Sequence, residues 1–299
     1  MELNYYNEKI FSKRLIKNEE TTFLFGSALS AIKDGAGIPN VSQVTEIIEA
    51  YATELDLLED YKEHIGAVDE KERYQESFAF FSGIMGASST KEIVNRVVMK
   101  NYDDVAKMHR IPKAIQDFVS CIKKEKIKVK NIITTNFDTL IEEQFKNEGI
   151  NYNSISIVGD SNINENSNGF INIIHLHGVW DKGDTMHTKN QLQAQRNKIE
   201  ASLRNCIAKE NVVVMAYSGW LDSFTRTLTN IVNDVEEEYN LAWCFYQNDS
   251  GVIDRESKNI IVPLTPAINR DRIQFFKGID CNNIFSNLLS EKSLSQKKK

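Results

Sequence analysis

The chain of 299 residues is predicted to be an α/β protein with a Rossmann-like, doubly wound parallel sheet. From about residue 129 onward, apolar runs of strand length alternate with segments of helical periodicity, a pattern that favours parallel strands joined by helical crossovers. Two of these runs, residues 131–135 and 170–176, end abruptly in polar side chains. Because parallel strands present their carboxyl ends at one edge of a sheet, we expect a binding crevice at that edge.

The first strand is expected at residues 22–25, followed by the turn Gly26-Ser-Ala-Leu-Ser30 and a second tight loop, Gly35-Ala-Gly-Ile-Pro39. From residue 42 to about 127, apolar residues recur at helical spacing and no convincing strand is found. Pro112 fits the first turn of a further helix that runs to Lys124.

We therefore predict a single domain, residues 1–299, with a helical insertion of three or four segments. The insertion covers about residues 42–128, and the Rossmann-like core covers about residues 20–41 and 129–290. In the second half, the expected strands are residues 131–135, 170–176, 212–216, 241–246 and 260–263. The expected helices there are residues 139–147, 194–208 and 224–239. Residues 159–169 read as a polar loop, and residues 293–299 as a charged tail that frays.

Composition narrows the class of protein. The net charge of -6 argues against binding nucleic acid through the whole surface, and no direct nucleic-acid partner is expected. Every apolar run is far shorter than the roughly 18 residues of a membrane span, and the amino terminus lacks a signal core, so a cytoplasmic protein is expected. The four cysteines are widely separated, which predicts buried free thiols rather than disulfides or a zinc site.

Several motifs sit where the predicted strands end. The turn Gly26-Ser-Ala-Leu-Ser30 suits an anion such as pyrophosphate, although Ala28 stands where a second glycine would be expected, and an ordinary tight turn is an equal alternative. The Gly-Ile-Pro loop ending at Pro39 covers a ligand or simply connects two helices. Asn136 follows its strand directly and is expected to face the crevice, whereas Asp138 either faces the crevice or caps the next helix.

Two histidines, His175 and His177, share one face of a strand. His177 precedes a glycine, so its imidazole is expected to be exposed as a base near neutral pH, while His175 reads as a core or supporting histidine. His187 lies in a loop from which it reaches the site only if that loop folds over it.

Later segments offer further contacts. Ser218 and Gly219 are expected to touch a sugar or phosphate, Trp220 to stack or form a wall, and Asp222 to cap a helix. The run from Ala242 to Tyr246 reads as a floor for an adenine ring or, more simply, as core packing.

Together these residues resemble the sirtuin superfamily. The matching pieces occur in family order over about residues 21–250: a Gly-x-x-x-Ser turn, Gly-Ile-Pro, Thr-x-Asn-x-Asp, a His-Gly strand end and a Tyr-Ser turn. The chain differs from the protein-deacylating sirtuins in four ways. Gly-Ser-Ala replaces Gly-Ala-Gly, Asn40-Val-Ser replaces Asp-Phe-Arg, Thr135-Asn-Phe-Asp138 replaces Gln-Asn-Ile-Asp, and the four-cysteine zinc module is absent.

The stretches Leu176–Trp180, Asp184–Thr188 and Ser218–Asp222 look instead like bacterial sirtuin-like effectors of antiphage defence, which cleave NAD+. This resemblance implies NAD+ as the substrate, no metal, and control by homo-oligomerisation or by a sensor or companion protein. It implies that His177 acts as a base on water or a ribose hydroxyl and that Asn136 positions it. The implied cofactor-binding residues are Gly26, Ser27, Ser30, Pro39, Thr135, Asp138, Ser218, Gly219 and Tyr246.

The main hypothesis is therefore an NAD+ hydrolase that forms ADP-ribose. One alternative is a protein deacylase or ADP-ribosyltransferase that uses the same cofactor. The other is a non-catalytic nucleotide-binding scaffold, which the altered glycine turn favours.

Overall fold

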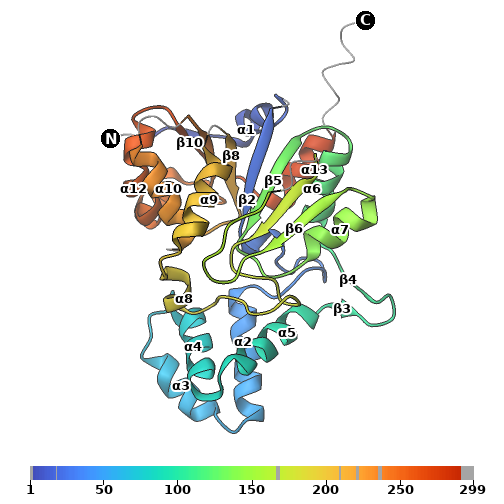
Figure 1. The fold of residues 1–299 in the computed structure, drawn as a ribbon, viewed down its shortest axis with the longest axis vertical. Coiled ribbons are helices and arrows are strands. Elements are labelled where there is room, and N and C mark those ends of the chain that lie inside the picture. The colour runs from blue at the N-terminus through green and yellow to red at the C-terminus, as the bar shows by residue number, and fades with distance from the viewer. Residues whose placement is uncertain are drawn as a thin grey trace, which may run out of the picture.

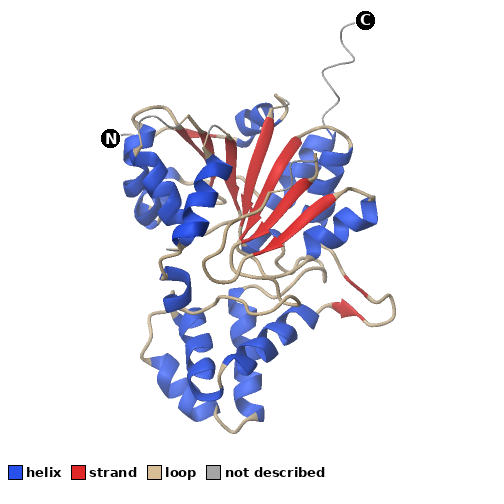
Figure 2. Cartoon of the chain, in the orientation of Figure 1, coloured by secondary structure: helices blue, strands red, loops and turns tan. Residues whose placement is uncertain are grey.

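A computed structural model shows an α/β fold built on one parallel sheet, with a separate group of helices at one edge of that sheet (Figures 1 and 2). The structure describes residues 3–17, 19–165, 169–208, 210–219, 222–234 and 238–290. Trp220 and the expected tail of residues 293–299 lie outside these residues, as does part of the polar loop of residues 159–169.

Within the described residues, eight strands form the main sheet, and every pairing in it is parallel. In spatial order they are β1 Tyr5–Tyr6, β10 Ile273–Phe276, β9 Asn240–Cys244, β8 Asn211–Met215, β2 Glu20–Phe25, β5 Lys128–Thr134, β7 Ile171–His175 and β6 Tyr152–Ser156. From β2 the chain goes to β5, then to the outermost strand β6 and back to β7 on one side, and later returns to β8 on the other side. The strand order thus reverses between β2 and β8, which is where doubly wound sheets bind their ligands.

Strand residues alternate between two cores because both faces of the sheet are covered. Phe23, Phe25 and Ile132 belong to one core, with α1 Glu8–Leu15, α6 Lys113–Lys123, α7 Leu140–Glu148 and α13 Cys281–Ser290. Leu24 and Ile133 belong to the other core, with α9 Asn197–Ile207, α10 Ser223–Asn233, α11 Ser250–Glu256 and α12 Lys258–Ile268.

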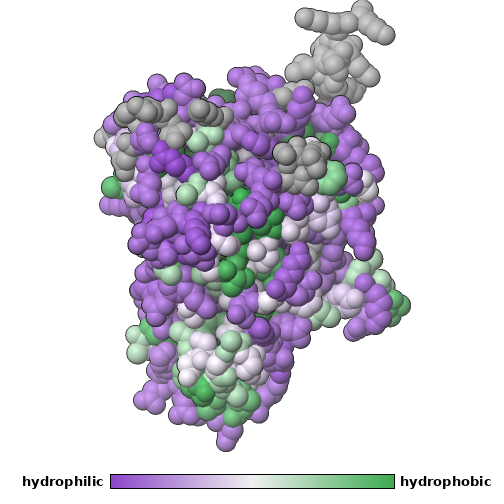
Figure 3. Space-filling model, viewed as in Figure 1, coloured by the Kyte–Doolittle hydropathy of each residue, from purple (hydrophilic) through white to green (hydrophobic). Residues whose placement is uncertain are grey.

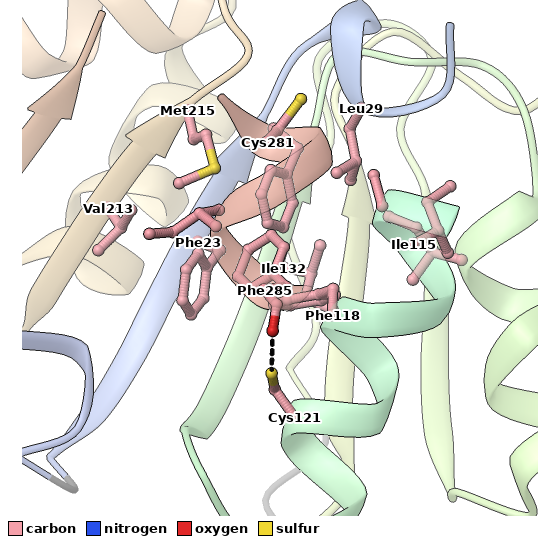
Figure 4. Close-up of a cluster of buried hydrophobic side chains, with 14 of the residues drawn as sticks. Phe23, Leu29, Ile115, Phe118, Cys121, Ile132, Val213, Met215, Cys281 and Phe285 are labelled. Carbon is pink, nitrogen blue, oxygen red and sulfur yellow. Dashed lines mark hydrogen bonds between the residues drawn. The ribbon is translucent and has the colours of Figure 1, made fainter. Parts of the chain in front are cut away.

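The first core is rich in aromatic rings. Figure 4 shows Phe23, Phe118 and Phe285 packed together, with the Cys121 thiol donating to the Phe285 carbonyl at 3.4 Å. All four cysteines are buried free thiols, which confirms that prediction. Burial raises the pKa of the Cys121 thiol to about 12, so this thiol stays protonated and packs as an apolar group.

The helical insertion forms a third core of its own. Its helices are α2 Val41–Glu54, α3 Leu58–Gly66, α4 Arg73–Met85 and α5 Ala87–Met99. Asn40 begins α2 with a capping box, in which its side chain accepts from the Gln43 N–H and the Gln43 side chain accepts from the Asn40 N–H. Figure 1 shows these helices below the edge at which the strands end, and Phe137 and Trp180 of the sheet's loops pack against them.

The structure differs from the sequence-based expectations at several elements. Residues 260–263 were expected to be a strand but lie in α12, because Ile260, Ile261, Leu264 and Ala267 bury one helical face. The expected helix of residues 194–208 corresponds to α9, the short helix α8 Lys189–Gln193 before it was missed, and the expected helix of residues 224–239 ends at Asn233.

Strands β1, β6 and β10 were missed, as were the two-residue strands β3 Tyr102–Asp103 and β4 Met108–His109 within the range expected to lack strands. Residues 241–246 form a strand only as far as Cys244. Helix α6 falls within the range expected for the insertion, but its buried side chains pack in the first core of the sheet. The short helical turn η1 Ser27–Leu29 follows β2.

The face shown in Figure 3 is mostly hydrophilic, with apolar areas near its middle and on the lower part of the insertion. Helix α4 ends in exposed Ile84 and Met85. Within the described ranges, no helix has the length and apolar character of a membrane span.

Candidate active site

A pocket opens at the carboxyl edge of the sheet, at the reversal of strand order. Four strand-end loops line it: Ser27 follows β2, Thr135 and Asn136 follow β5, His177 follows β7, and Tyr217 and Ser218 follow β8. The opposite wall is mainly apolar and consists of Ile38, Pro39, Val41, Val44, Tyr74, Phe137, Met186 and His187. Residues from the helical insertion thus complete a pocket whose polar groups come from the sheet.

Gly26 sets how closely two of these loops approach each other. A Cβ atom at this position would lie 2.3 Å from the Ala216 carbonyl oxygen and 2.7 Å from Tyr217 Cα. Only glycine therefore lets the turn after β2 pass the turn after β8 at this distance. The result is that Ser27 and Ser218 both lie at the rim of the pocket, and both are exposed.

Asn136 is buried and held from two sides. Its Nδ2 donates to the Gly26 carbonyl at 3.3 Å and to Ser30 Oγ at 3.1 Å, and its backbone N–H donates to Thr134 Oγ1 at 3.0 Å. The amide nitrogen is thus committed to the protein. Its amide oxygen is the group that remains for a ligand, and this oxygen accepts hydrogen bonds.

Asp138 lies behind Asn136 and does not line the pocket. Its Oδ1 accepts from Ser30 Oγ at 3.2 Å and from the Leu140 N–H at 3.1 Å, at the start of α7. Burial raises the pKa of Asp138, opposed by these two hydrogen bonds. This arrangement agrees with the capping alternative for Asp138, while a contact with the nicotinamide end stays a prediction.

His175 forms a buried ion pair below the pocket. Its Nε2 contacts Glu142 Oε1 at 2.7 Å and its Nδ1 contacts the Asn136 carbonyl oxygen at 2.9 Å. Both partners are acceptors, so both ring nitrogens carry protons. Burial alone lowers the pKa of His175, but the charge and hydrogen bond of Glu142 leave it above 6.5. The resulting imidazolium fixes the backbone from which Asn136 projects.

His177 occupies the pocket end of the same segment. Its ring is buried, and its Nε2 lies 3.5 Å from Asp222 Oδ2. The following residue, Gly178, has φ of 84°, and a Cβ there would lie 2.3 Å from the Asp184 carbonyl oxygen. The chain can therefore turn sharply after His177 only because this position is glycine.

His187 joins the sheet's loops to the insertion. Its Nδ1 lies 3.0 Å from the hydroxyl of Tyr74 in α4, its Nε2 lies 2.7 Å from Thr185 Oγ1, and its ring stacks on Phe78 at 4.1 Å. Burial, with a smaller effect from His177, lowers the pKa of His187 to about 3, so the ring is neutral. His187 is suited to shaping the wall and unsuited to holding a proton near neutral pH.

Residues 130–261 match the model of the SIR2-like domain. Over this span the chain is similar to that family. The matched span holds Asn136, His175, His177 and Asp222, whereas the Gly26 turn and the insertion lie before it. No curated protein sequence matches the chain.

Solved structures of Sir2 proteins are similar at low sequence identity. One, with a deacetylated p53 peptide and 3′-O-acetyl ADP-ribose, is 10% identical, with a TM-score of 0.45 over 95% of this chain and 98% of that one. Another, a Sir2 variant with a p53 peptide and NAD, is 13% identical, with a TM-score of 0.43 over 94% and 97%.

The structure places six of the predicted residues on one pocket, namely Ser27, Pro39, Thr135, Asn136, His177 and Ser218. Gly26, Ser30 and Asp138 stand directly behind them, through their bonds to Asn136 and to each other. Gly219 is buried beside Ile260 and does not line the pocket. Tyr246 is 78% exposed and lines a separate depression with Asn7, Asn248 and Lys277, so the structure does not bring it to the sirtuin-like site.

Sequence reasoning missed Tyr74 and the pairing of Asp222 with His177. No pattern in the sequence distinguishes Tyr74 from the core aromatic residues of its helix. Asp222 was expected to be a helix cap, and it is one, since its Oδ1 accepts from the Thr225 N–H at 3.0 Å. Among the described residues, no group of three or more His, Cys, Asp or Glu side chains is placed to hold a metal ion.

Proposed function

We propose that the protein is an NAD+ hydrolase that releases nicotinamide and forms ADP-ribose. The observation that carries this proposal is that Asn136 and His177 line one pocket at the reversal of strand order. The sirtuin-like match over residues 130–261 supports NAD+ as the substrate.

The residues suit glycosidic cleavage. When the bond between ribose C1′ and the nicotinamide nitrogen breaks, its electron pair leaves with nicotinamide, and positive charge develops on the ribose. A water oxygen then bonds to C1′ and loses a proton, which His177 accepts as general base. The amide oxygen of Asn136 accepts a hydrogen bond from that water or from a ribose hydroxyl and so orients it.

The predicted binding residues divide by position. Ser27 and Ser218 at the rim are proposed to contact phosphate and the adenosine ribose, with Pro39 and Thr135 lining the nicotinamide end. Gly26, Ser30 and Asp138 support Asn136 from behind. Gly219 and Tyr246 would contact NAD+ only if their loops moved towards the pocket.

The size of the pocket supports control of the activity. Its enclosed space is about 80 Å³, whereas ligand pockets usually measure roughly 300–1,000 Å³. We propose that the wall contributed by Tyr74 and its helix moves when NAD+ enters, and that oligomerisation or a companion protein favours the open form. By the resemblance described above, the resulting depletion of NAD+ would serve antiphage defence.

The decisive experiment mixes the purified protein with NAD+, alone and with a protein encoded by a neighbouring gene, and separates the products chromatographically. We expect free nicotinamide and ADP-ribose in equal amounts, both lost in Asn136→Ala and His177→Ala. His64→Ala, on the exposed surface of α3, is the matched control and should keep full activity.

Three other outcomes would overturn parts of the proposal. O-acyl-ADP-ribose formed only with an acetylated peptide would identify a deacylase. Bound NAD+ without turnover in any state would identify a scaffold, and full activity of the isolated monomer would refute the proposed control.

A further inference from the structure

Asp222 does more than begin a helix. Its side chain is completely buried. Oδ1 caps α10 by accepting from the Thr225 N–H at 3.0 Å. Oδ2 accepts from the Tyr217 hydroxyl at 2.7 Å and lies 3.5 Å from His177 Nε2. An N-cap needs one acceptor oxygen, so Oδ2 is available to Tyr217 and to His177, whose Nε2 is buried without a hydrogen-bond partner among the described residues.

A buried arginine lies within electrostatic range of this carboxylate. Arg196 is 2% exposed, and the negative charge of Asp222 acts on it. Its Nε donates to Ser223 Oγ at 2.9 Å and its Nη1 to the Leu176 carbonyl at 3.1 Å. Arg196 thus joins the residue after Asp222 to the residue before His177. A positive charge in the surroundings favours the ionised form of a buried carboxylate.

The electrostatic surroundings agree with an ionised Asp222. Burial alone raises the pKa of this carboxyl, but the charge of His177 and the hydrogen bonds from Thr225 and Tyr217 leave it below the ordinary value. His187, whose ring is neutral, lines the same pocket as His177, and its Nδ1 contacts the hydroxyl of Tyr74. Asp222 is therefore a negatively charged group that faces the imidazole of His177.

We propose that Asp222 is a positioning residue, whose carboxylate holds His177 in the tautomer with the proton on Nε2 and so leaves Nδ1 as the base. This inference rests on the proposed hydrolysis of NAD+. When Nδ1 takes the proton from water, the imidazolium keeps its Nε2–H towards Asp222, which stabilises the new positive charge without accepting the proton.

The first test needs no activity. Histidines are labelled with 15N, and long-range proton–nitrogen spectra of the wild type and of Asp222→Asn are compared at a pH where His177 is neutral, with His177→Gln used to assign the signals. We expect the wild type to show the Nε2–H tautomer and Asp222→Asn to show a mixture. A wild-type Nδ1–H tautomer, or an identical spectrum in the variant, would overturn the proposal.

The second test separates positioning from folding and from binding. Asparagine keeps the volume of Asp222 and its capping ability, so Asp222→Asn should fold and bind NAD+ with an unchanged Kd while kcat falls by about a hundredfold or more. Asp222→Glu should restore part of kcat. The matched control is Asp249→Asn, a change of the same kind at the N-cap of α11, outside the pocket, which should leave kcat unchanged.

The outcomes are distinguishable. If the wild type does not hydrolyse NAD+, the proposed function fails while the tautomer measurement still tests the role of Asp222. If Asp222→Asn loses kcat and NAD+ affinity together, or keeps a normal kcat, the positioning role is wrong. If Asp222→Asn does not fold, the wild-type tautomer and the kcat of Asp222→Glu decide the matter.

Discussion

Two histidines, two residues apart on the same strand end, each face a buried carboxylate, and the two pairs differ in what surrounds them. His175 and Glu142 are in contact at 2.7 Å, and both ring nitrogens of His175 meet protein acceptors. His177 and Asp222 are 3.5 Å apart, and His177 lines the pocket. The protein contacts both ring nitrogens of His175, whereas, within the described residues, Nε2 of His177 faces Asp222 without a hydrogen bond and the proposed mechanism leaves its Nδ1 for a substrate.

This difference shows that the roles of the two pairs cannot be assigned from their residue types alone. Both pairs are a histidine and an acid, and both are buried. His175 lies in the last position of β7, inside the sheet, whereas His177 lies beyond the strand, where Gly178 turns the chain. A doubly protonated histidine cannot act as a base, so the pair inside the sheet supports structure and the pair beyond it is available for chemistry.

The largest expected effect separates activity from stability. His177→Ala should lower NAD+ hydrolysis by about 10² to 10⁴-fold, the usual range for a lost general base. Its melting temperature should change much less than that of His175→Ala, which leaves Glu142 buried without its partner. Initial rates and differential scanning calorimetry of both variants test this. Equal losses of stability in the two variants would contradict the assignment of a structural role to His175 and a chemical role to His177.

Removing Glu142, the acid that pairs with His175, should lower the stability of the folded protein. Glu142→Ala is expected to lower the free energy of unfolding by about 3–5 kcal/mol, because it leaves a buried imidazolium unpaired. Urea denaturation monitored by circular dichroism measures this change. Glu148→Ala, which removes an acid of the same helix α7 whose partner Lys123 is exposed, is the control and should cost clearly less. An equally small effect of both changes would mean that His175 is neutral.

The pH dependence of stability should carry the signature of the same pair. The pKa of His175 is raised above 6.5. Its contribution to the free energy of unfolding is therefore fully present below pH 6.5 and is lost as pH rises through the folded-state pKa. The pKa of Glu142 is lowered below 4.5. Its contribution to the free energy of unfolding is therefore fully present above pH 4.5 and is lost as pH falls through the folded-state pKa.

The stabilisation by the pair should therefore be greatest between pH 4.5 and 6.5 and should decline on both sides. Unfolding free energies measured from pH 4 to 9 should show a smaller dependence on pH in His175→Gln than in the wild type. His64→Gln, a surface change, should leave the wild-type profile intact. Parallel wild-type and His175→Gln profiles would contradict the assignment of a charged His175.

The smallest expected effect concerns His187, a buried histidine whose ring contacts hydroxyl groups and, in the part of the chain that the structure describes, no carboxylate. Tyr74→Phe removes the hydroxyl that lies 3.0 Å from His187 Nδ1 and should lower the free energy of unfolding by about 0.5–1.5 kcal/mol. Tyr61→Phe, which removes a buried hydroxyl bonded to Ser77 within the insertion, is a matched comparison. If the pocket wall moves as proposed, Tyr74→Phe alone should change the KM for NAD+.

Much of the fold could be predicted where the pattern is strong. The strand at β2 and the segments around Asn136 and His177 are continuous apolar runs with abrupt polar ends, and such runs suit strands buried on both faces. Strand β6 is partly exposed along its whole length and has no apolar run to find. In α12 the run Ile-Ile-Val fits a strand equally well in isolation, and only its packing against β10 and α10 makes it a helix.

The sequence by itself determined which chemical groups stand at the strand ends, because hydrophobic periodicity fixes the strands and the next residue in the chain must then emerge at the edge. It also placed Gly178 directly after His177, where the chain turns with a positive φ. Only the tertiary structure decided which groups meet, since Asp222 and His177 are 45 residues apart and Tyr74 comes from a different core altogether. The pattern of neighbouring residues in the sequence does not predict such pairings, because they arise from the packing of whole helices against the sheet.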